Sequence, residues 1–111
     1  MVMGRPCAPA YFYSSLGTDP DLGDLVDMFV EEMPQRAATL RDSWERADWE
    51  SFGRAAHQLK GAAGSYGFSD LTPCLTRLDA GVKNRSPEDE IAQLLDEVLD
   101  ACSRVRGGAP E

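Results

Sequence analysis

Residues 52–67 read Phe-Gly-Arg-Ala-Ala-His-Gln-Leu-Lys-Gly-Ala-Ala-Gly-Ser-Tyr-Gly, and they contain His57, the only histidine of the chain. A helix turns by about 100° per residue, so this stretch sorts into two faces. The expected core face carries Phe52, Ala55, Leu59, Ala62, Ala63 and Tyr66. The opposite face carries Arg54, His57, Lys60, Gly61 and Gly64. We therefore expect a helix whose imidazole points into solvent rather than into a core.

The neighbours of His57 predict the kind of group that approaches it. Glycine within a helix costs roughly 1 kcal/mol relative to alanine, yet Gly61 and Gly64 share the face of His57. This indicates that side-chain bulk there is harmful, and we expect the two glycines to leave docking space for a partner. Close packing against another helix is the alternative explanation. Arg54 and Lys60 lie three residues before and after His57, which makes them helical neighbours and favours an anionic approaching group.

The longest amphipathic stretch predicts a helix from about residue 20 to residue 47. Asp19 can cap its start, and Pro20 suits the first helical position. Its apolar residues recur at spacings of three and four: Leu22, Leu25, Val26, Phe29, Met33, Ala37, Leu40 and Trp44. Pro34 interrupts the stretch, but the apolar stripe keeps its phase, so we expect one kinked helix rather than two.

Three more amphipathic helices are expected after residue 47. Asp48 can cap the helix that carries His57, and Gly67 can end it. A third helix begins near Ser69 and ends in a loop at residues 81–85. Ser86-Pro87 is a strong start signal for the fourth helix, with Ser86 as cap and proline at the first position. The fourth apolar stripe consists of Ile91, Leu94, Leu95, Val98, Leu99, Cys102 and Val105.

Four amphipathic helices with short connections and no credible strand predict an all-α fold, an antiparallel four-helix bundle with a short N-terminal extension. We expect residues 1–15 to be a partly disordered extension, residues 16–106 to form the bundle and residues 107–111 to be a disordered tail. At 111 residues the chain has room for one domain.

Composition narrows the possible partners and locations. The formal net charge is −8, which argues against nucleic acid and anionic membranes as partners, since both need clustered cations. No apolar run approaches the ~20 residues that span a bilayer. The first residues lack the apolar region of a secretory signal. We expect a cytoplasmic monomer.

The three cysteines, Cys7, Cys74 and Cys102, have no spacing typical of a metal site. Cys74 and Cys102 fall on or beside apolar stripes, so we interpret them as small buried hydrophobic residues in a reducing compartment. With one histidine and dispersed cysteines, no bound metal is expected.

The pentapeptide His57-Gln58-Leu59-Lys60-Gly61, followed by small residues and Gly67, resembles the signature of histidine-containing phosphotransfer (HPt) domains of bacterial phosphorelays. The flanks agree: an acidic helix with a Glu-Glu-x-Pro step, Asp48-Trp49-Glu50 before the histidine helix, and a leucine-rich helix after it. The likeness covers about residues 22–80, more than half of the chain.

The resemblance implies that His57 accepts a phosphoryl group from a receiver-domain aspartyl phosphate and passes it to the aspartate of another receiver. It also implies that Lys60 stabilises the phosphoryl group. Arg54 is a further candidate from helical geometry. Gln58 could hydrogen-bond a phosphoryl oxygen, although it lies a quarter-turn away from His57.

The implied partners are response-regulator receiver domains and a hybrid sensor kinase. The chain shows no glycine-rich phosphate loop and no acidic Mg²⁺ cluster, so we expect it to bind no ATP and no cofactor of its own. The receiver would supply Mg²⁺. The expected protein is a phosphocarrier, not an enzyme with independent turnover.

Two alternatives stay open at this point. One is a helical adaptor that binds receiver or kinase domains through the same face without phosphorylation. The other is the dimerisation-and-phosphoacceptor domain of a sensor kinase. The usual motif of that domain has an acidic residue after the histidine and a downstream proline, which Gln58 and the glycines here do not match.

Overall fold

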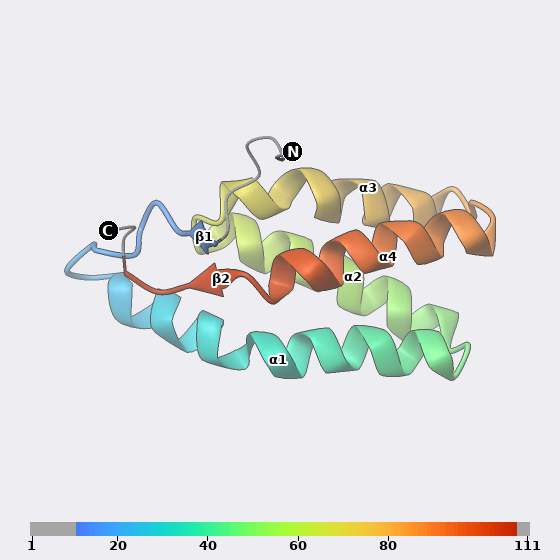
Figure 1. The fold of residues 1–111 in the computed structure, drawn as a ribbon, viewed down its shortest axis with the longest axis horizontal. Helices are drawn as coiled ribbons and strands as arrows, with labels where there is room; N and C mark the ends of the chain where they lie inside the picture. The colour runs from blue at the N-terminus through green and yellow to red at the C-terminus, as the bar shows by residue number, and fades with distance from the viewer. Residues whose placement is uncertain (1–10, 109–111) are drawn as a thin grey trace, which may run out of the picture.

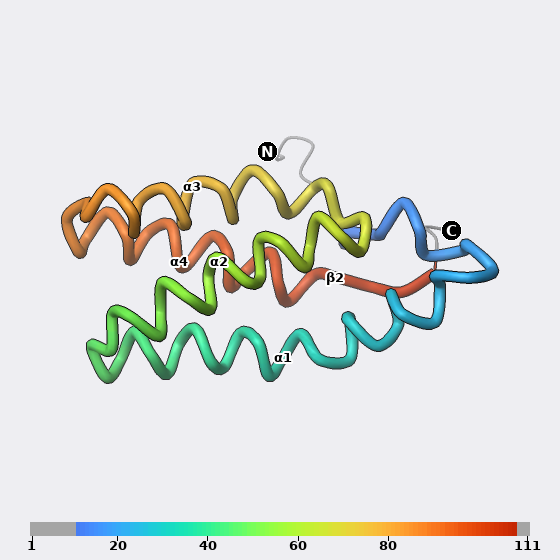
Figure 2. The backbone as a smooth tube through the Cα atoms, turned by 180° about the vertical axis from the view of Figure 1, so that it is seen from behind, coloured from blue at the N-terminus to red at the C-terminus, as the bar shows by residue number. Residues whose placement is uncertain are grey.

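The computed structural model describes residues 11–108, and within them the chain is mostly helical. The elements are β1 (Phe12–Tyr13), α1 (Gly23–Glu45), α2 (Trp49–Ser65), the 3₁₀ turn η1 (Ser69–Leu71), α3 (Thr72–Lys83), α4 (Glu88–Cys102) and β2 (Val105–Arg106). In Figure 1, α1 and α3 lie along opposite edges, with α4 in front and α2 behind. Figure 2 shows the other side, where α2 crosses in front. The expected helical bundle is confirmed; among the described residues, no helix is long and apolar enough to cross a membrane.

Helix α1 runs unbroken through Pro34, which confirms one helix rather than two. Its stripe places Val26, Phe29 and Met33 in the core, while the proline faces solvent. The expected start was three residues early. Asp19 Oδ1 accepts hydrogen bonds from the backbone nitrogens of Asp21 (2.7 Å) and Leu22 (3.0 Å), so its side chain caps a turn that precedes the helix.

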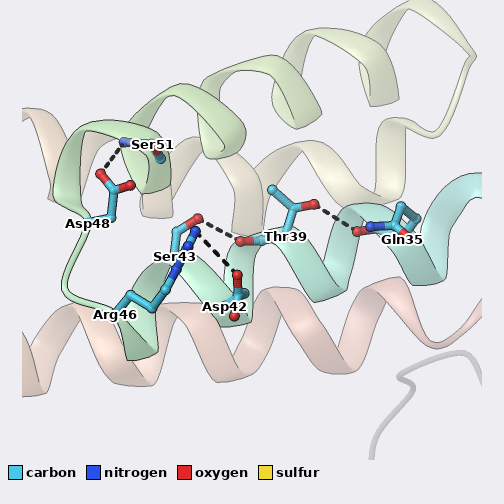
Figure 3. Close-up of polar contacts among 7 residues, drawn as sticks. All are labelled: Gln35, Thr39, Asp42, Ser43, Arg46, Asp48 and Ser51. Atoms are coloured by element: carbon cyan, nitrogen blue, oxygen red, sulfur yellow. Dashed lines mark hydrogen bonds and ion pairs between the residues drawn. The ribbon is translucent and has the colours of Figure 1, made fainter.

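The turn between α1 and α2 sets the direction of α2 (Figure 3). Asp48 Oδ1 accepts a hydrogen bond from Ser51 N at 3.2 Å, which confirms Asp48 as the N-cap. The hydrogen bonds from Ser51 hold the pKa of Asp48 below its usual value. In the preceding turn of α1, the Ser43 hydroxyl donates to Thr39 O at 2.7 Å. Ala47, between the helices, has a φ of 55°.

The end of α2 is built as the sequence indicates. Gly67 has a φ of +80°, a conformation that glycine adopts without strain. The Gly67 nitrogen donates to Gly64 O (3.2 Å) and the Phe68 nitrogen donates to Ala63 O (2.9 Å), the paired bonds of a Schellman motif. Phe68 is fully buried directly after this turn. Gly67 is therefore confirmed as the stop that turns the chain into η1 and α3.

The expectation of no strand was wrong in a small way. Phe12 and Tyr13 pair in parallel with Val105 and Arg106, which ties the N-terminal stretch to the chain after α4. We expected Val105 to end the fourth apolar stripe, but α4 stops at Cys102. Two-residue strands are too short to show alternation in the sequence, and their pairing joins distant residues, so no local pattern marks them.

The fourth helix also begins one residue later than expected. Its first helical residue is Glu88, Pro87 is the N-cap residue, and no side chain caps this end. The expected cap by Ser86 was therefore wrong. Glu88, Asp89 and Glu90 fill the first turn, where carboxylates interact favourably with the positive end of the helix dipole.

Two cysteines lie within the described residues, and both are free thiols. Cys102 is buried in the core, and burial raises its pKa to about 12. Cys74 is half-buried, and burial raises the pKa of its thiol as well. These positions confirm the interpretation of Cys102 as a small core residue, while Cys7 lies outside the described residues.

Candidate functional site

His57 lies in the middle of α2 on the face that the helical phase predicted. Its side chain is 60% exposed, whereas Phe52, Ala56 and Leu59 on the other face are buried. Asp48 caps one end of α2 and Gly67 closes the other. The imidazole is therefore presented outward from a helix that is fixed at both ends.

An aspartate that the sequence reasoning missed lies directly beside His57. Asp79 on α3 has a side chain that is only 5% exposed, and its Oδ1 lies 3.4 Å from His57 Nδ1. Its other oxygen, Oδ2, accepts a hydrogen bond from Lys60 Nζ at 3.0 Å. The same Oδ2 lies 3.1 Å from Lys83 Nζ. Helices α2 and α3 thus bring one imidazole and two ammonium groups together on one carboxylate.

The Asp79 carboxylate is charged because its partners outweigh its burial. Burial raises the pKa of this carboxyl group, but the hydrogen bonds and the positive charges of Lys60 and Lys83 together lower it by more, and the net pKa lies below the usual value. At neutral pH the group is an anion. An anion beside Nδ1 favours the ring tautomer with its proton on Nδ1, which leaves the lone pair on Nε2.

A sequence signal for Asp79 existed. Leu75, Leu78 and Val82 form the apolar stripe of α3, and Asp79 lies within that stripe, four residues after Leu75 and three before Val82. A carboxylate at a core position is rare unless a cation satisfies it. Lys83, four residues later, supplies one such cation from the same helix. The second cation, Lys60, comes from α2, and no pattern within α3 indicates it.

Two other residues proposed from the sequence lie farther from this cluster. Arg54 is exposed, and its Nη2 lies 3.7 Å from Glu50 Oε2, one turn earlier on α2. Gln58 is exposed on the side of α2 that faces α1, where it lines a small cavity with Arg36 and Ala55. Neither has a contact with Asp79 that would bring it into the cluster, and their roles toward a phosphoryl group stay predictions.

The glycines near His57 border open space. A Cβ atom added to Gly61 or Gly64 would meet no atom within 4 Å. Close helix packing, the alternative explanation, applies instead to Gly53, where a Cβ atom would come within 3.1 Å of Val82 Cγ1. The space beside Gly61 and Gly64 is therefore open, whereas α2 approaches α3 closely at Gly53.

The family follows from comparison with known proteins. A model of the Hpt domain matches residues 24–108, more than half of the chain and all of the helices that build the site. The chain belongs to the Hpt domain family. Comparisons with curated proteins and with solved structures gave no significant match. Hpt domains are phosphocarrier modules of two-component signalling that interact with receiver and kinase domains and are not independent enzymes.

The Asp79 cluster predicts how the stability of this Hpt domain depends on pH. A carboxylate with a lowered pKa stabilises the fold above its unfolded-state pKa of about 3.9, and this stabilisation is lost as the pH falls through the lower folded-state pKa. We expect Asp79→Asn to destabilise the domain by about 1–3 kcal/mol at pH 7, because Lys60 and Lys83 lose their anion. The difference from wild type should shrink below pH 4.

Thermal melts at pH 7 and pH 3 measure this effect. Asp96→Asn is the matched control, since Asp96 is exposed on α4 and its replacement also removes one negative charge. Equal destabilisation by Asp79→Asn at both pH values would contradict the role of the carboxylate charge.

Proposed function

We propose that this Hpt domain accepts a phosphoryl group on His57 from a receiver-domain aspartyl phosphate and passes it to the aspartate of a second receiver. The observation that carries the proposal is the exposed imidazole with Nδ1 3.4 Å from the Asp79 carboxylate. A histidine with one ring nitrogen directed at an anion and the other free is suited to act as a nucleophile near neutral pH.

The transfer step balances without a separate base. The Nε2 lone pair of His57 forms the new N–P bond, while the bond between phosphorus and the receiver's carboxylate oxygen breaks and its electron pair stays on that oxygen. The Nδ1 proton remains on the ring, where Asp79 faces it. The return step toward a second receiver reverses these changes, so the proton need not leave the ring in either direction.

Lys60 is proposed to stabilise the transferred group, because its ammonium contacts Asp79 Oδ2 and the other oxygen of that carboxylate faces the ring. Arg54 and Gln58 are proposed as outer contacts of the phosphoryl group or the receiver, and Gly61 and Gly64 as docking space. Mg²⁺ on the receiver would neutralise the remaining charge in the transition state. The proposed carrier is a cytoplasmic monomer, an antiparallel bundle that serves receiver domains and a hybrid sensor kinase.

A phosphotransfer profile tests this function. The purified chain is incubated with each radiolabelled, phosphorylated receiver domain of the source organism, and label on the chain is followed over time. We expect label from a small subset of receivers within seconds to minutes, in an adduct that is acid-labile and stable to alkali. Receivers that bind the chain without labelling it would instead favour the helical adaptor and contradict the proposal.

A further inference from the structure

We propose that Lys83 is a second phosphoryl-contacting cation of this site. In the resting protein it contacts Asp79, which faces His57, and once His57 is phosphorylated Lys60 and Lys83 divide Asp79 and the phosphoryl oxygens between them. This inference rests on the proposed function. Lys83 belongs to the last turn of α3, outside the motif that carries the histidine, and only the fold brings it to α2.

Lys60 and Lys83 occupy equivalent positions relative to the carboxylate that faces His57. Lys60 Nζ and Lys83 Nζ lie 3.0 Å and 3.1 Å from the same atom, Asp79 Oδ2. The other oxygen of that carboxylate lies 3.4 Å from His57 Nδ1. Both ammonium groups therefore contact the carboxylate that faces the imidazole. A lysine has a flexible four-carbon stem and three donors, so each ammonium can turn from Asp79 toward a group on the ring.

A phosphoryl group on His57 brings more negative charge than one lysine can balance beside Asp79. With Asp79 ionised, the carboxylate and the two lysines sum to one positive charge. A phosphoryl group adds about −1.5 to −2 at neutral pH, in a protein whose formal net charge is already −8. One ammonium group cannot satisfy both a buried carboxylate and three phosphoryl oxygens. Two ammonium groups can divide these acceptors between them, which explains why helices α2 and α3 each supply one.

Both lysine side chains reach solvent, so they can change partners without disturbing the core. The Lys83 side chain is 60% exposed and that of Lys60 is 31% exposed. Because most of the Lys83 side chain is in solvent, water can solvate its ammonium group as it leaves Asp79, which lowers the cost of the exchange. Asp79 is not left without a partner, because the Nδ1–H group of the phosphorylated ring still faces it. The exchange moves no proton and forms no covalent bond.

A double-mutant cycle tests the proposal. Single-turnover transfer from a saturating phosphorylated receiver is measured for Lys60→Ala, Lys83→Ala and the double variant. We expect each single variant to slow transfer about tenfold, the loss of one charge-assisted hydrogen bond that its neighbour partly replaces. The double variant should be slower than the product of the two single effects, because no neighbour remains. Lys83→Arg should retain most of the wild-type rate.

Arg77→Ala is the matched control. Arg77 lies on the same helix and carries the same charge, but it pairs with Glu97 of α4 at 2.8 Å. If Lys83 acted only by attracting the receiver electrostatically, Arg77→Ala and Lys83→Ala would weaken this attraction equally. Both variants would then need a higher receiver concentration for half-maximal rate. If Lys83 contacts the phosphoryl group, Lys83→Ala lowers the transfer rate at saturating receiver and Arg77→Ala does not.

The outcomes separate this inference from the proposed function. Wild-type transfer rates in Lys83→Ala, or an equal loss in Arg77→Ala, would overturn the role of Lys83 while His57 is still labelled. A wild-type chain that no receiver labels would overturn the proposed function itself. Circular dichroism of each variant confirms that the helices are retained.

Discussion

Replacing His57 by glutamine is expected to abolish phosphoryl transfer to this protein without unfolding it. The sequence contains no other histidine, so no second imidazole can take over. The His57 side chain is 60% exposed and belongs to none of the buried positions of α2. Glutamine keeps a similar length and good helix propensity, so the cost in stability should be a few tenths of a kcal/mol.

The measurement is label on the chain after incubation with a phosphorylated receiver, together with the helical circular dichroism signal. Gln93→Glu is a useful control, because it alters an exposed side chain of α4 and leaves α2 and His57 unchanged. Retention of acid-labile label by His57→Gln would show that another residue is phosphorylated and would end the assignment.

The second large effect is expected at Gly64. A Cβ atom there would meet nothing within 4 Å, so Gly64→Leu should stabilise the helix by up to roughly 1 kcal/mol on propensity alone. The same leucine would project into the space that a receiver needs to bring its aspartate to His57. Transfer should fall by about 100-fold or more, because productive geometry is lost while His57 and Lys60 are intact.

Two matched variants control for bulk and for packing. Ala38→Leu adds a leucine to an exposed position of α1 and should leave transfer unchanged. Gly53→Leu should lower the melting temperature, because even the first carbon of a side chain would come within 3.1 Å of Val82. A Gly64→Leu protein that is stabilised and still transfers phosphate at the wild-type rate would disprove the docking-space argument.

Local patterns predicted the features of this fold that depend on neighbouring residues. The phase of α2 could be assigned because apolar and polar residues alternate at helical spacing, which put His57 outward and Phe52 inward. The Asp48 cap and the Gly67 stop could be assigned because each depends on a few adjacent residues. The β1–β2 pair could not, since it joins residues more than 90 positions apart through two residues on each side.

The part of the site that lies on one helix could be predicted, because it depends on residues that are close in the sequence. His57 and Lys60 lie one turn apart on one helix, so their proximity follows from helix geometry alone. Asp79 and Lys83 come from α3, and their approach to α2 depends on how two helices pack, including the close contact at Gly53. Periodicity describes one helix at a time, so it marks Asp79 as a core position of α3 without showing that this carboxylate lies beside His57.

The Asp79 carboxylate faces Nδ1 of His57, so Nε2 is the ring nitrogen left for a receiver domain to approach. Under the proposed function, the donor and the acceptor must then come to the same atom from the same side, and each excludes the other. The two receivers therefore bind one after the other, and the first must dissociate before the second can bind. The rate of phosphoryl relay is then limited by the dissociation rates of the receivers, so a substitution that slows dissociation of either receiver would slow the relay.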